Sequence, residues 1–242
     1  MFDTFKNRLE LSGTLSTVTA LRIGAGRSLD PTSSDLPVMK DALGRPLIPG
    51  SSFKGAMRSR LESFLRGIDL SLAIDPSELV NSYWMNRLKL QKEAATDDAS
   101  LTQSLIAMTD RVSLLFGSPW MAGKLQIQDL PVVEELWFGQ YQERDGVSIE
   151  RDTETAADGR KYDFQVVPAG TLFSFKAIVE NASDAELGLL TIGLNQFENE
   201  MIPLGGGNSR GLGVVKLDLT EMIWVNPANP QELLEYLKNL VT

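Results

Sequence analysis

The chain has 242 residues, of which 43% are apolar and 23% are charged, a composition typical of globular proteins. It contains no cysteine and no histidine, which excludes disulfides, the usual zinc ligand sets, a Ser-His-Asp triad and a histidine general base. Any catalysis must use carboxylates, Lys, Tyr, hydroxyls or a hard metal ion held by oxygen atoms. Because there is no membrane-length apolar run and no signal-peptide pattern, we expect a cytoplasmic protein without membrane contact.

The net charge of −9 is unevenly distributed along the chain. Residues 1–66 contain ten Lys or Arg and six Asp or Glu. The remaining 176 residues contain 13 Lys or Arg and 26 Asp or Glu. Binding of a polyanion depends on where cations cluster rather than on their total. The acidic total therefore does not exclude a nucleic-acid partner for the first part of the chain.

In chain order, residues 8–21 alternate apolar and polar side chains and predict a half-buried strand. A short glycine loop (22–26) and a polar loop (27–36) follow. Residues 37–41 and 47–48 predict two short strand pieces around a turn at Gly44.

Residues 47–67, LIPGSSFKGAMRSRLESFLRG, predict a strand end, a tight turn at Pro49-Gly50 and a helix with Ser51 or Ser52 as N-cap. Every fourth residue is apolar, which predicts one buried stripe: Phe53, Met57, Leu61 and Leu65.

Lys54 and Arg58 lie four residues apart on a neighbouring stripe of this helix. A helix start with free N–H groups, capping hydroxyls and two cations is suited to phosphate. The alternative is an ordinary amphipathic helix with a solvated basic edge.

Residues 68–116 predict a helical insertion, with one helix beginning at Asp75 as N-cap and Pro76 in its first position, and more helix over 101–116. Strands are predicted over 124–131 and 134–140. Residues 141–168 are polar, highly charged and too long for an ordinary loop, which favours a protruding hairpin.

The remaining elements are a strand at 171–179, an amphipathic helix at 184–198, a strand at 214–219 and a small helix at 231–241. This order favours a single α+β domain over residues 1–242, with helices on one face of an antiparallel sheet. A ferredoxin-like, RRM-like core fits it best.

The loop before the last strand, Gly205–Gly213, holds five glycines and one arginine. Glycines permit positive φ and close approach of the backbone to a phosphate, and a guanidinium adds a fork of donors. A flexible turn is the alternative. The candidate anion-binding residues are Gly205, Gly206, Gly207, Ser209, Arg210 and Gly211.

Four motifs, in order, resemble the RAMP superfamily of CRISPR-associated proteins, and in particular the repeated backbone subunit of type III effector complexes. They are Asp35-x-Pro-Val-x-Lys-Asp41, Ile48-Pro-Gly-Ser-Ser-Phe-Lys-Gly-x-x-Arg58, Ile149-x-Arg151-x-Thr153-x-x-Ala156 with Val167-Pro-x-Gly170-x-x-Phe173, and Leu204-Gly-Gly-Gly-x-Ser-Arg-Gly-x-Gly213. The family often has His where Arg22 stands.

The resemblance implies an RRM-like palm and a thumb (141–168), stacked with neighbouring RAMP subunits and other effector subunits along a guide RNA. By position it implies that Asp35 cleaves the target RNA with Mg²⁺ or another divalent cation. It also implies that Arg151 acts at the thumb, and that guide phosphates are held by Arg22, Ser51, Ser52, Lys54, Arg58 and the 205–211 loop.

The residues themselves support part of this reading. Asp35 lies on a polar loop where a carboxylate can bind Mg²⁺ or orient a ribose 2′-OH, and metal-assisted cleavage is chemistry that a chain without histidine permits. Asp35 as a turn-capping residue is the alternative. Asp30, before a proline, is a turn former, and Asp41 a structural partner at a strand end.

The leading hypothesis is therefore a target-cleaving backbone subunit. A structural RNA-binding subunit in which Asp35 does not cut is the second. A RAMP endonuclease that processes precursor guide RNA is a third, disfavoured because that activity commonly relies on His. An unrelated domain is the fourth.

Overall fold

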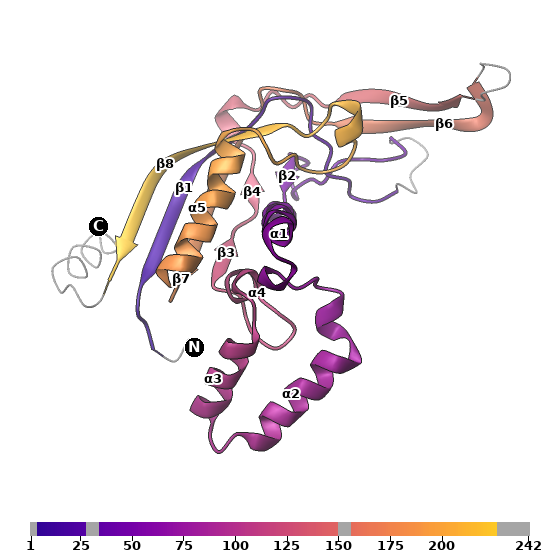
Figure 1. Ribbon diagram of the computed structural model, residues 1–242. Helices are drawn as coiled ribbons and strands as arrows, with labels where there is room; N and C mark the ends of the chain where they lie inside the picture. Colours follow the sequence, from indigo (N-terminus) through magenta and orange to yellow (C-terminus); the bar gives the residue numbers. More distant parts are fainter. Residues whose placement is uncertain (1–3, 28–33, 150–155, 227–242) are drawn as a thin grey trace.

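The computed structural model describes residues 4–27, 34–149 and 156–226 (Figure 1). The strands are β1 Arg8–Thr17, β2 Leu47–Ile48, β3 Leu125–Ile127, β4 Leu130–Pro131, β5 Gln142–Ile149, β6 Ala156–Val166, β7 Leu172–Glu180 and β8 Val215–Val225. The helices are α1 Gly50–Ile68, α2 Ser82–Ala94, α3 Asp98–Met108, α4 Arg111–Phe116 and α5 Asp184–Glu198. Four 3₁₀ turns complete the described elements: η1 Leu70–Leu72, η2 Glu78–Val80, η3 Glu134–Leu136 and η4 Asn208–Arg210.

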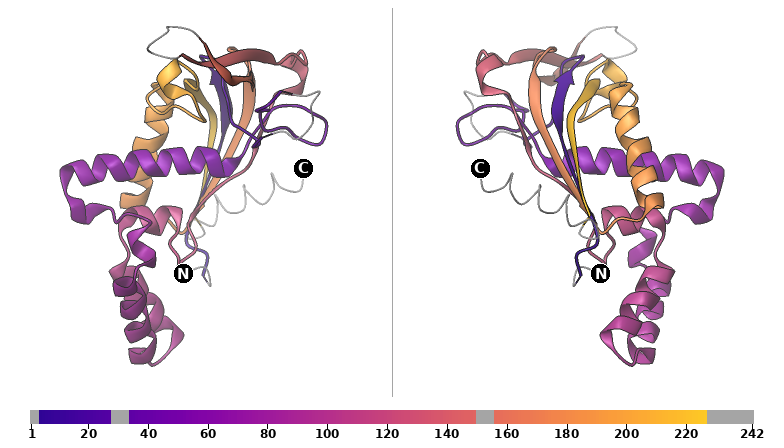
Figure 2. Two further views of the ribbon diagram at one scale, coloured as in Figure 1. Left: turned by 90° about the vertical axis from the view of Figure 1, so that its right-hand side faces the viewer. Right: turned by 90° about the vertical axis from the view of Figure 1, so that its left-hand side faces the viewer.

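The central feature is a four-stranded antiparallel sheet in the order β3-β7-β1-β8. Strand β1 pairs with β7 on one side and β8 on the other, so that Leu11 lies opposite both Ala177 and Met222. Helices α1 and α5 cover one face of this sheet (Figure 2). The predicted α+β arrangement, with helices on one face of an antiparallel sheet, is confirmed.

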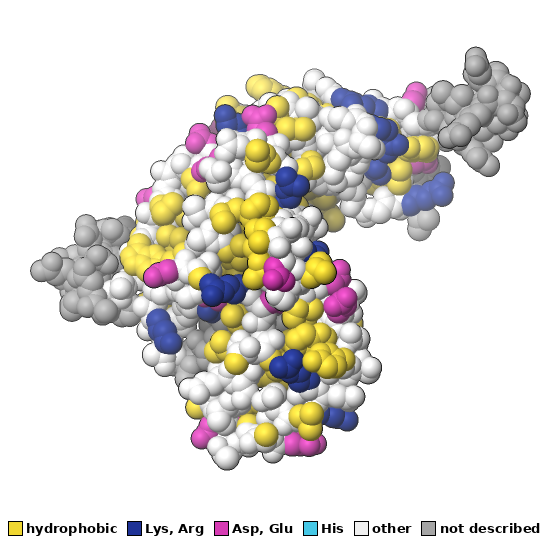
Figure 3. Space-filling view, viewed as in Figure 1, with side chains coloured by type: hydrophobic (Ala, Val, Ile, Leu, Met, Phe, Trp, Pro, Cys, Tyr) yellow, Lys and Arg dark blue, Asp and Glu magenta, His cyan; other side chains and the backbone are white. Residues whose placement is uncertain are grey.

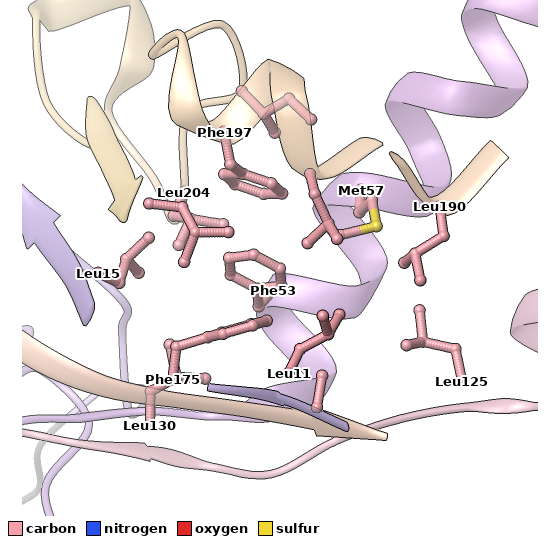
Figure 4. Packing of buried hydrophobic residues seen from close by; sticks show 14 of the residues in the cluster. Leu11, Leu15, Phe53, Met57, Leu125, Leu130, Phe175, Leu190, Phe197 and Leu204 are labelled. Carbon is pink, nitrogen blue, oxygen red and sulfur yellow. The ribbon is translucent and has the colours of Figure 1, made fainter. Parts of the chain in front are cut away.

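The core is built on the predicted stripe of α1. Phe53 is fully buried; its ring stacks on Phe197 of α5 at 4.1 Å between centroids and lies 5.1 Å from Phe175 of β7 (Figure 4). Met57 and Leu61 are also fully buried, whereas Leu65 is only partly buried. The four-residue apolar spacing therefore identified the face of α1 that holds the domain together.

The start of α1 differs from the prediction. The helix begins at Gly50, with Pro49 in the N-cap position and no side-chain cap, so neither Ser51 nor Ser52 is the N-cap. The N–H of Gly50 instead donates to the Asp129 carboxylate at 2.8 Å. A Cβ at Gly50 would lie 2.3 Å from the carbonyl oxygen of Ile127, the last residue of β3, so this close packing requires glycine.

The helical segment between α1 and β3 is present, but its first helix starts later than predicted. The Asp75 carboxylate accepts the N–H of Ser77 and closes a local turn, while Asn81 caps α2 through the N–H of Trp84. The predicted helix over 101–116 is two helices, because Asp110 starts α4 as a new N-cap.

The predicted strand over 134–140 was wrong. Residues 134–136 form η3, and the N–H groups of Leu136 and Trp137 donate to Val133 and Glu134 rather than to a neighbouring strand. Trp137 packs against the main core and its ring meets that of Tyr141. The predicted helix over 231–241 lies outside the described residues.

Strands β5 and β6 form an antiparallel hairpin that projects from one end of the sheet (Figure 1). Its ladder runs from Gln142 opposite Val166 to Ile149 opposite Ala156. The predicted protruding hairpin is therefore present. Within the described ranges, no helix combines the length and apolar character needed to cross a membrane.

Candidate nucleic-acid interface

A small apolar cluster at the base of the hairpin joins four segments that are distant in sequence. Its buried members are Ala20, Phe164, Val166 and Leu212, with Leu36 and Tyr162 packed against them. These residues come from the end of the first strand region, strand β6, the glycine loop and the Asp35 segment. We call the polar residues held around this cluster the hairpin-base site: Arg22, Asp35, Asp163 and residues 205–211.

The glycine loop is fixed against the Arg22 segment by backbone contacts. The N–H of Gly206 donates to the Arg22 carbonyl at 2.8 Å. Gly205 has φ +72°, and a Cβ there would lie 2.1 Å from the same carbonyl oxygen. Glycine at 205 is thus required both by the backbone conformation and by the close approach.

The tip of the loop exposes donors. Gly207 and Gly211 are left-handed and flank η4, and the N–H groups of Gly207, Asn208 and Ser209 form no hydrogen bond within the described residues. Successive N–H groups in such a turn form a concavity that suits an anion. The side chains of Ser209 and Arg210 are exposed beside them.

Arg22 connects this loop to the hairpin. Its guanidinium carbon lies 5.3 Å from the centre of the Phe164 ring, within cation–π range. Its Nε is buried and has no hydrogen-bond partner among the described residues. Arg22 therefore lies between the glycine loop and the hairpin base with unused hydrogen-bonding capacity.

Asp35 is half-buried and paired with Asp163 of β6. The N–H of Asp35 donates to Asp163 Oδ1, and the N–H of Asp163 donates to Asp35 Oδ2, each at 3.3 Å. The next residue extends the contact, since the Leu36 carbonyl accepts the N–H of Gln165. The N–H of Asp35 is the main cause that lowers the pKa of Asp163.

A pocket of about 510 Å³ opens beside this pair. Its lining consists of Asp35, Glu143, Asp145, Tyr162 and Asp163. No group of three or more carboxylates in the described part of the chain is close enough to form a complete protein cage for a metal. Mg²⁺, however, is commonly bound by one or two carboxylates together with substrate phosphates, so Asp35 and Asp163 fit a cation that RNA helps to bind.

Lys54 and Arg58 lie elsewhere, half-buried between α1 and the elements beside it. Lys54 Nζ donates to the Leu125 carbonyl at 2.7 Å, and burial, assisted by the charge of Arg58, lowers the pKa of Lys54. Arg58 donates to Glu62, to the Gly117 carbonyl and to Ser113. Both side chains thus connect α1 to neighbouring elements.

The structure therefore separates the predicted site residues into two groups. Arg22, Asp35 and the glycine loop converge at the hairpin base, whereas Lys54 and Arg58 face β3 and α4 and are joined to that site by no hydrogen bond or ion pair in the described ranges. Ser51 is exposed and Ser52 half-buried on the first turn of α1. Arg151 lies outside the described residues.

Sequence reasoning missed Asp163, which lies 128 residues from Asp35. In the sequence, Asp163 is one of many charged residues in the polar stretch 141–168, and no sequence spacing relates it to Asp35. Asp41 was interpreted correctly as structural, because its carboxylate accepts the N–H groups of Leu43 and Arg45 and forms an ion pair with Arg45 at 2.8 Å.

The surface around the hairpin base carries cations as well as carboxylates. Figure 3 shows Lys and Arg side chains gathered over the end of the body from which β5 and β6 project. The acidic total of the chain is thus locally offset there, as its uneven charge distribution suggested.

The chain is, as a class, an α+β protein whose projecting hairpin rises from a site that brings Arg22 and the exposed glycine loop together with two paired carboxylates. It belongs to the RAMP superfamily, whose family model matches residues 14–216. It is 24% identical over 212 residues to the CRISPR system Cms endoribonuclease Csm3 of Enterococcus italicus, covering 87% of this chain and 89% of that protein.

Two further proteins of the same name match over shorter stretches. That of Mycobacterium tuberculosis is 45% identical over 56 residues, 22% of this chain and 24% of that protein. That of Methanocaldococcus jannaschii is 43% identical over 60 residues, 24% of each.

Proposed function

We propose that this chain is a guide-RNA-binding backbone subunit of a type III CRISPR effector complex, and that Asp35 cleaves the complementary target RNA with a divalent cation. Support comes from the superfamily membership and from similarity, over most of the chain, to a protein named as an endoribonuclease of a CRISPR system. The partners would be guide RNA, target RNA, neighbouring RAMP subunits and other effector subunits, in the cytoplasm. The observation that carries the proposal is the position of Asp35 at the base of a projecting hairpin.

The strand order supports a ferredoxin-like palm. Strands β1, β3, β7 and β8 alternate with α1 and α5 in the pattern strand, helix, strand, strand, helix, strand, and β1 lies between β7 and β8. In this reading α2–α4 are the helical insertion between α1 and β3. The β5–β6 hairpin is the thumb, which would contact the guide–target duplex.

Guide RNA would bind along the hairpin-base site. The exposed Arg210, the Ser209 hydroxyl and the free N–H groups at the loop tip are suited to phosphate oxygens, and Arg22 is suited to a second phosphate nearby. Lys54 and Arg58 remain predicted phosphate ligands, together with Ser51 and Ser52 on the first turn of α1. A contact from either cation to RNA would replace one of its internal hydrogen bonds.

The Asp35 carboxylate is suited to work on a ribose. Its Oδ2 is occupied by the N–H of Asp163, which fixes the carboxylate, while Oδ1 is available to accept the hydrogen bond of a 2′-OH. The 2′-oxygen would bond to the adjacent phosphorus as the bond from phosphorus to the 5′-oxygen breaks. The 2′ proton would pass to Oδ1, and the 5′-oxygen would leave as an alkoxide that takes a proton from water. A divalent cation bound beside Asp35 would neutralise phosphate charge.

The test is target cleavage by the reconstituted effector complex. Asp35→Asn removes the charge but keeps an oxygen for the N–H of Asp163. We expect cleavage to fall by at least about 10²-fold, as for loss of a catalytic acid–base group, while guide and target binding persist. Removing divalent metal with a chelator should give the same loss.

Asp41→Asn is the matched control, because Asp41 belongs to the same segment but has only structural partners. If Asp35→Asn cleaves at the wild-type rate, the catalytic assignment fails. The structural RNA-binding subunit, the alternative, then becomes the better description if the wild-type complex also binds target RNA without cutting it.

A further inference from the structure

A groove of about 480 Å³ lies where the last turns of α1, the η1 turn, the start of α4 and the first half of α5 meet. Its walls are mostly apolar, and we call four of the residues that line it the helix-end groove: Leu65, Leu72, Leu189 and Ile192. Leu72 and Ile192 are exposed to solvent. Figure 3 shows hydrophobic side chains gathered over the region where α1 crosses α5. An apolar surface of this kind is typical of a protein–protein interaction site.

The final turns of α1 extend this apolar surface beyond the groove. Arg60 of α1 donates to Gln196 of α5, which fixes the crossing of the two helices. Phe64 and Ile192 each lie one helical turn from these two residues, toward the groove. Phe64 and Ile68 are both exposed. The groove therefore has an aromatic and an aliphatic side chain at its edge, available to a partner.

A second exposed apolar cluster lies on the 41–45 turn and at η3. Arg45 forms an ion pair with Glu134 at 2.7 Å, and the Tyr141 hydroxyl donates to the Gly44 carbonyl, so the turn is held against the η3 segment. Three large apolar side chains on these two segments are exposed, the most exposed of them by 88%, and we call them the turn patch: Leu43, Leu136 and, most exposed, Phe138. An aromatic side chain left in water in this way is the kind of residue that anchors an interface.

The two surfaces lie at opposite ends of α1 (Figure 2). The turn and η3 adjoin the paired strands β2 and β4, and α1 begins directly after β2. Since a helix of 19 residues is about 28 Å long, the turn patch of a chain cannot fill the helix-end groove of the same chain. A second copy can fill it. Because such a contact joins two different surfaces, it repeats from copy to copy.

The charges at the two surfaces are complementary. Arg111 is exposed and lines the groove, while its neighbour Asp110 caps α4 through the N–H of Ser113. Glu135 is exposed directly beside Leu136 of the turn patch. Turn patch against groove brings the cation to the carboxylate, whereas groove against groove would bring two Arg111 side chains together. The charges therefore favour a head-to-tail contact over a symmetric one.

We propose that the helix-end groove of one copy receives the turn patch of the next copy, with Phe138 in the groove and Glu135 against Arg111. This inference rests on the proposed function, because it names the surfaces through which neighbouring copies of a backbone subunit would touch. The contact itself involves protein alone. It can therefore be measured independently of RNA cleavage.

The first test is disulfide cross-linking, because the chain has no cysteine and each variant would carry a single thiol. Ser71→Cys places the thiol in the groove lining, and Leu136→Cys places it in the turn patch. After mixing and mild oxidation, with guide RNA and at high concentration without it, we expect at least about fivefold more cross-linked dimer from the mixture than from either variant alone. Gln103→Cys, an exposed thiol on α3, should give no such excess when it is mixed with Leu136→Cys.

The second test is a charge exchange, followed by sedimentation of the full chain. Arg111→Glu and Glu135→Arg should each weaken self-association by about tenfold or more, because each places like charges opposite one another. The double variant restores an opposite-charge pair and should return to within about threefold of the wild-type affinity. Phe138→Ala should weaken association by about tenfold or more, whereas Leu90→Ala, which removes an exposed leucine of α2, should change it by less than about threefold.

Several results would overturn the inference. One is equal cross-linking in the mixture and in either single variant, which would indicate a symmetric contact. Another is cross-linking of the groove thiol to a different effector subunit but not to the turn patch of a second copy. Failure of the double variant to recover, with a normal circular dichroism spectrum, would exclude the Arg111–Glu135 pair. If the chain binds no guide RNA, the proposed function fails instead, and cross-linking of the RNA-free chain still decides the contact.

Discussion

Replacing Arg58 by Ala should destabilise the fold before it affects any RNA contact. Arg58 Nε donates to Glu62 at 2.7 Å, and the other guanidinium nitrogens donate to Ser113 of α4 and to the carbonyl of Gly117, which follows that helix. The side chain of Glu62 is only 6% exposed and that of Arg58 is 21% exposed. The Arg58→Ala variant would leave Glu62 buried, with Arg66 as its remaining cation at 3.8 Å.

Removing one partner of a buried ion pair costs about 3–5 kcal/mol, mostly because the other charge stays buried. Arg58 is partly exposed and Arg66 gives partial compensation, so we expect the lower end, about 3 kcal/mol. For a chain of this size that loss lowers the melting temperature by about 6–12 °C. Arg60→Ala is the control on the same helix: Arg60 is exposed and makes one exposed hydrogen bond, to Gln196 of α5, so its loss should cost only about 1 kcal/mol or less.

The measurement is urea unfolding followed by fluorescence of the four tryptophans, with Arg58→Ala, Glu62→Ala and the double variant forming a cycle. The double variant has neither charge of the pair, so neither is left buried without its partner. Its loss of unfolding free energy should therefore be about 2 kcal/mol smaller than the sum of the losses in the two single variants. A loss below about 0.5 kcal/mol in Arg58→Ala would refute the structural role. The double variant is also the proper background for testing Arg58 on RNA, since weak binding there cannot be attributed to the buried Glu62.

Three further outcomes are expected. Gly205→Ala should cost more stability than Gly44→Ala in urea unfolding. Both positions have φ near +75°, so both substitutions share a strain of about 1–2 kcal/mol, but only a Cβ at position 205 meets a backbone oxygen, at 2.1 Å. Equal losses of stability would contradict that close approach. Burial lowers the pKa of Lys54 in the folded state. Between this lowered pKa and the ordinary value of about 10.5, the unfolded chain binds more protons than the folded chain, so the unfolding free energy should rise with pH. The Lys54→Met variant should lack this rise. Arg210→Ala should weaken RNA binding and reduce the slope of log K against log salt by about 0.7–0.9, whereas Lys92→Ala on α2 should leave the slope unchanged.

The elements that could be predicted from the sequence are those with strong local signals. The apolar residues of α1 recur every fourth position, and β1 and β7 alternate along their length, so each element and its buried face followed directly. Glycines at positive φ marked the turn at Gly44 and the loop at 205–213. The helix start at Gly50 did not follow, because the acceptor that satisfies its N–H is Asp129, which comes from a distant connection.

The candidate site was predicted unevenly for the same reason. Motif resemblance pointed to Asp35 and to the glycine loop, but the pairing of Asp35 with Asp163 is decided by how the hairpin returns to the body. Leu36 and Phe164 pack in one small cluster, and that cluster sets the register between the two polar segments. No periodicity within either segment encodes a contact of this kind.

Lys54 and Arg58 on α1 and Arg210 on the glycine loop show why helical spacing predicts RNA contact less well than position on an exposed loop. The spacing of Lys54 and Arg58 correctly placed them on one stripe of α1, but spacing does not say what covers that stripe. Here Lys54 donates to Leu125 of β3, and Arg58 donates to Ser113 of α4 and to Gly117 directly after it. Arg210 lies on a loop whose glycines keep the backbone close to Arg22, and its side chain is exposed. A cation on an exposed loop is therefore more available to RNA than a cation at helical spacing beside a buried stripe. Mutation of Arg210 should reduce RNA affinity more than mutation of Lys54.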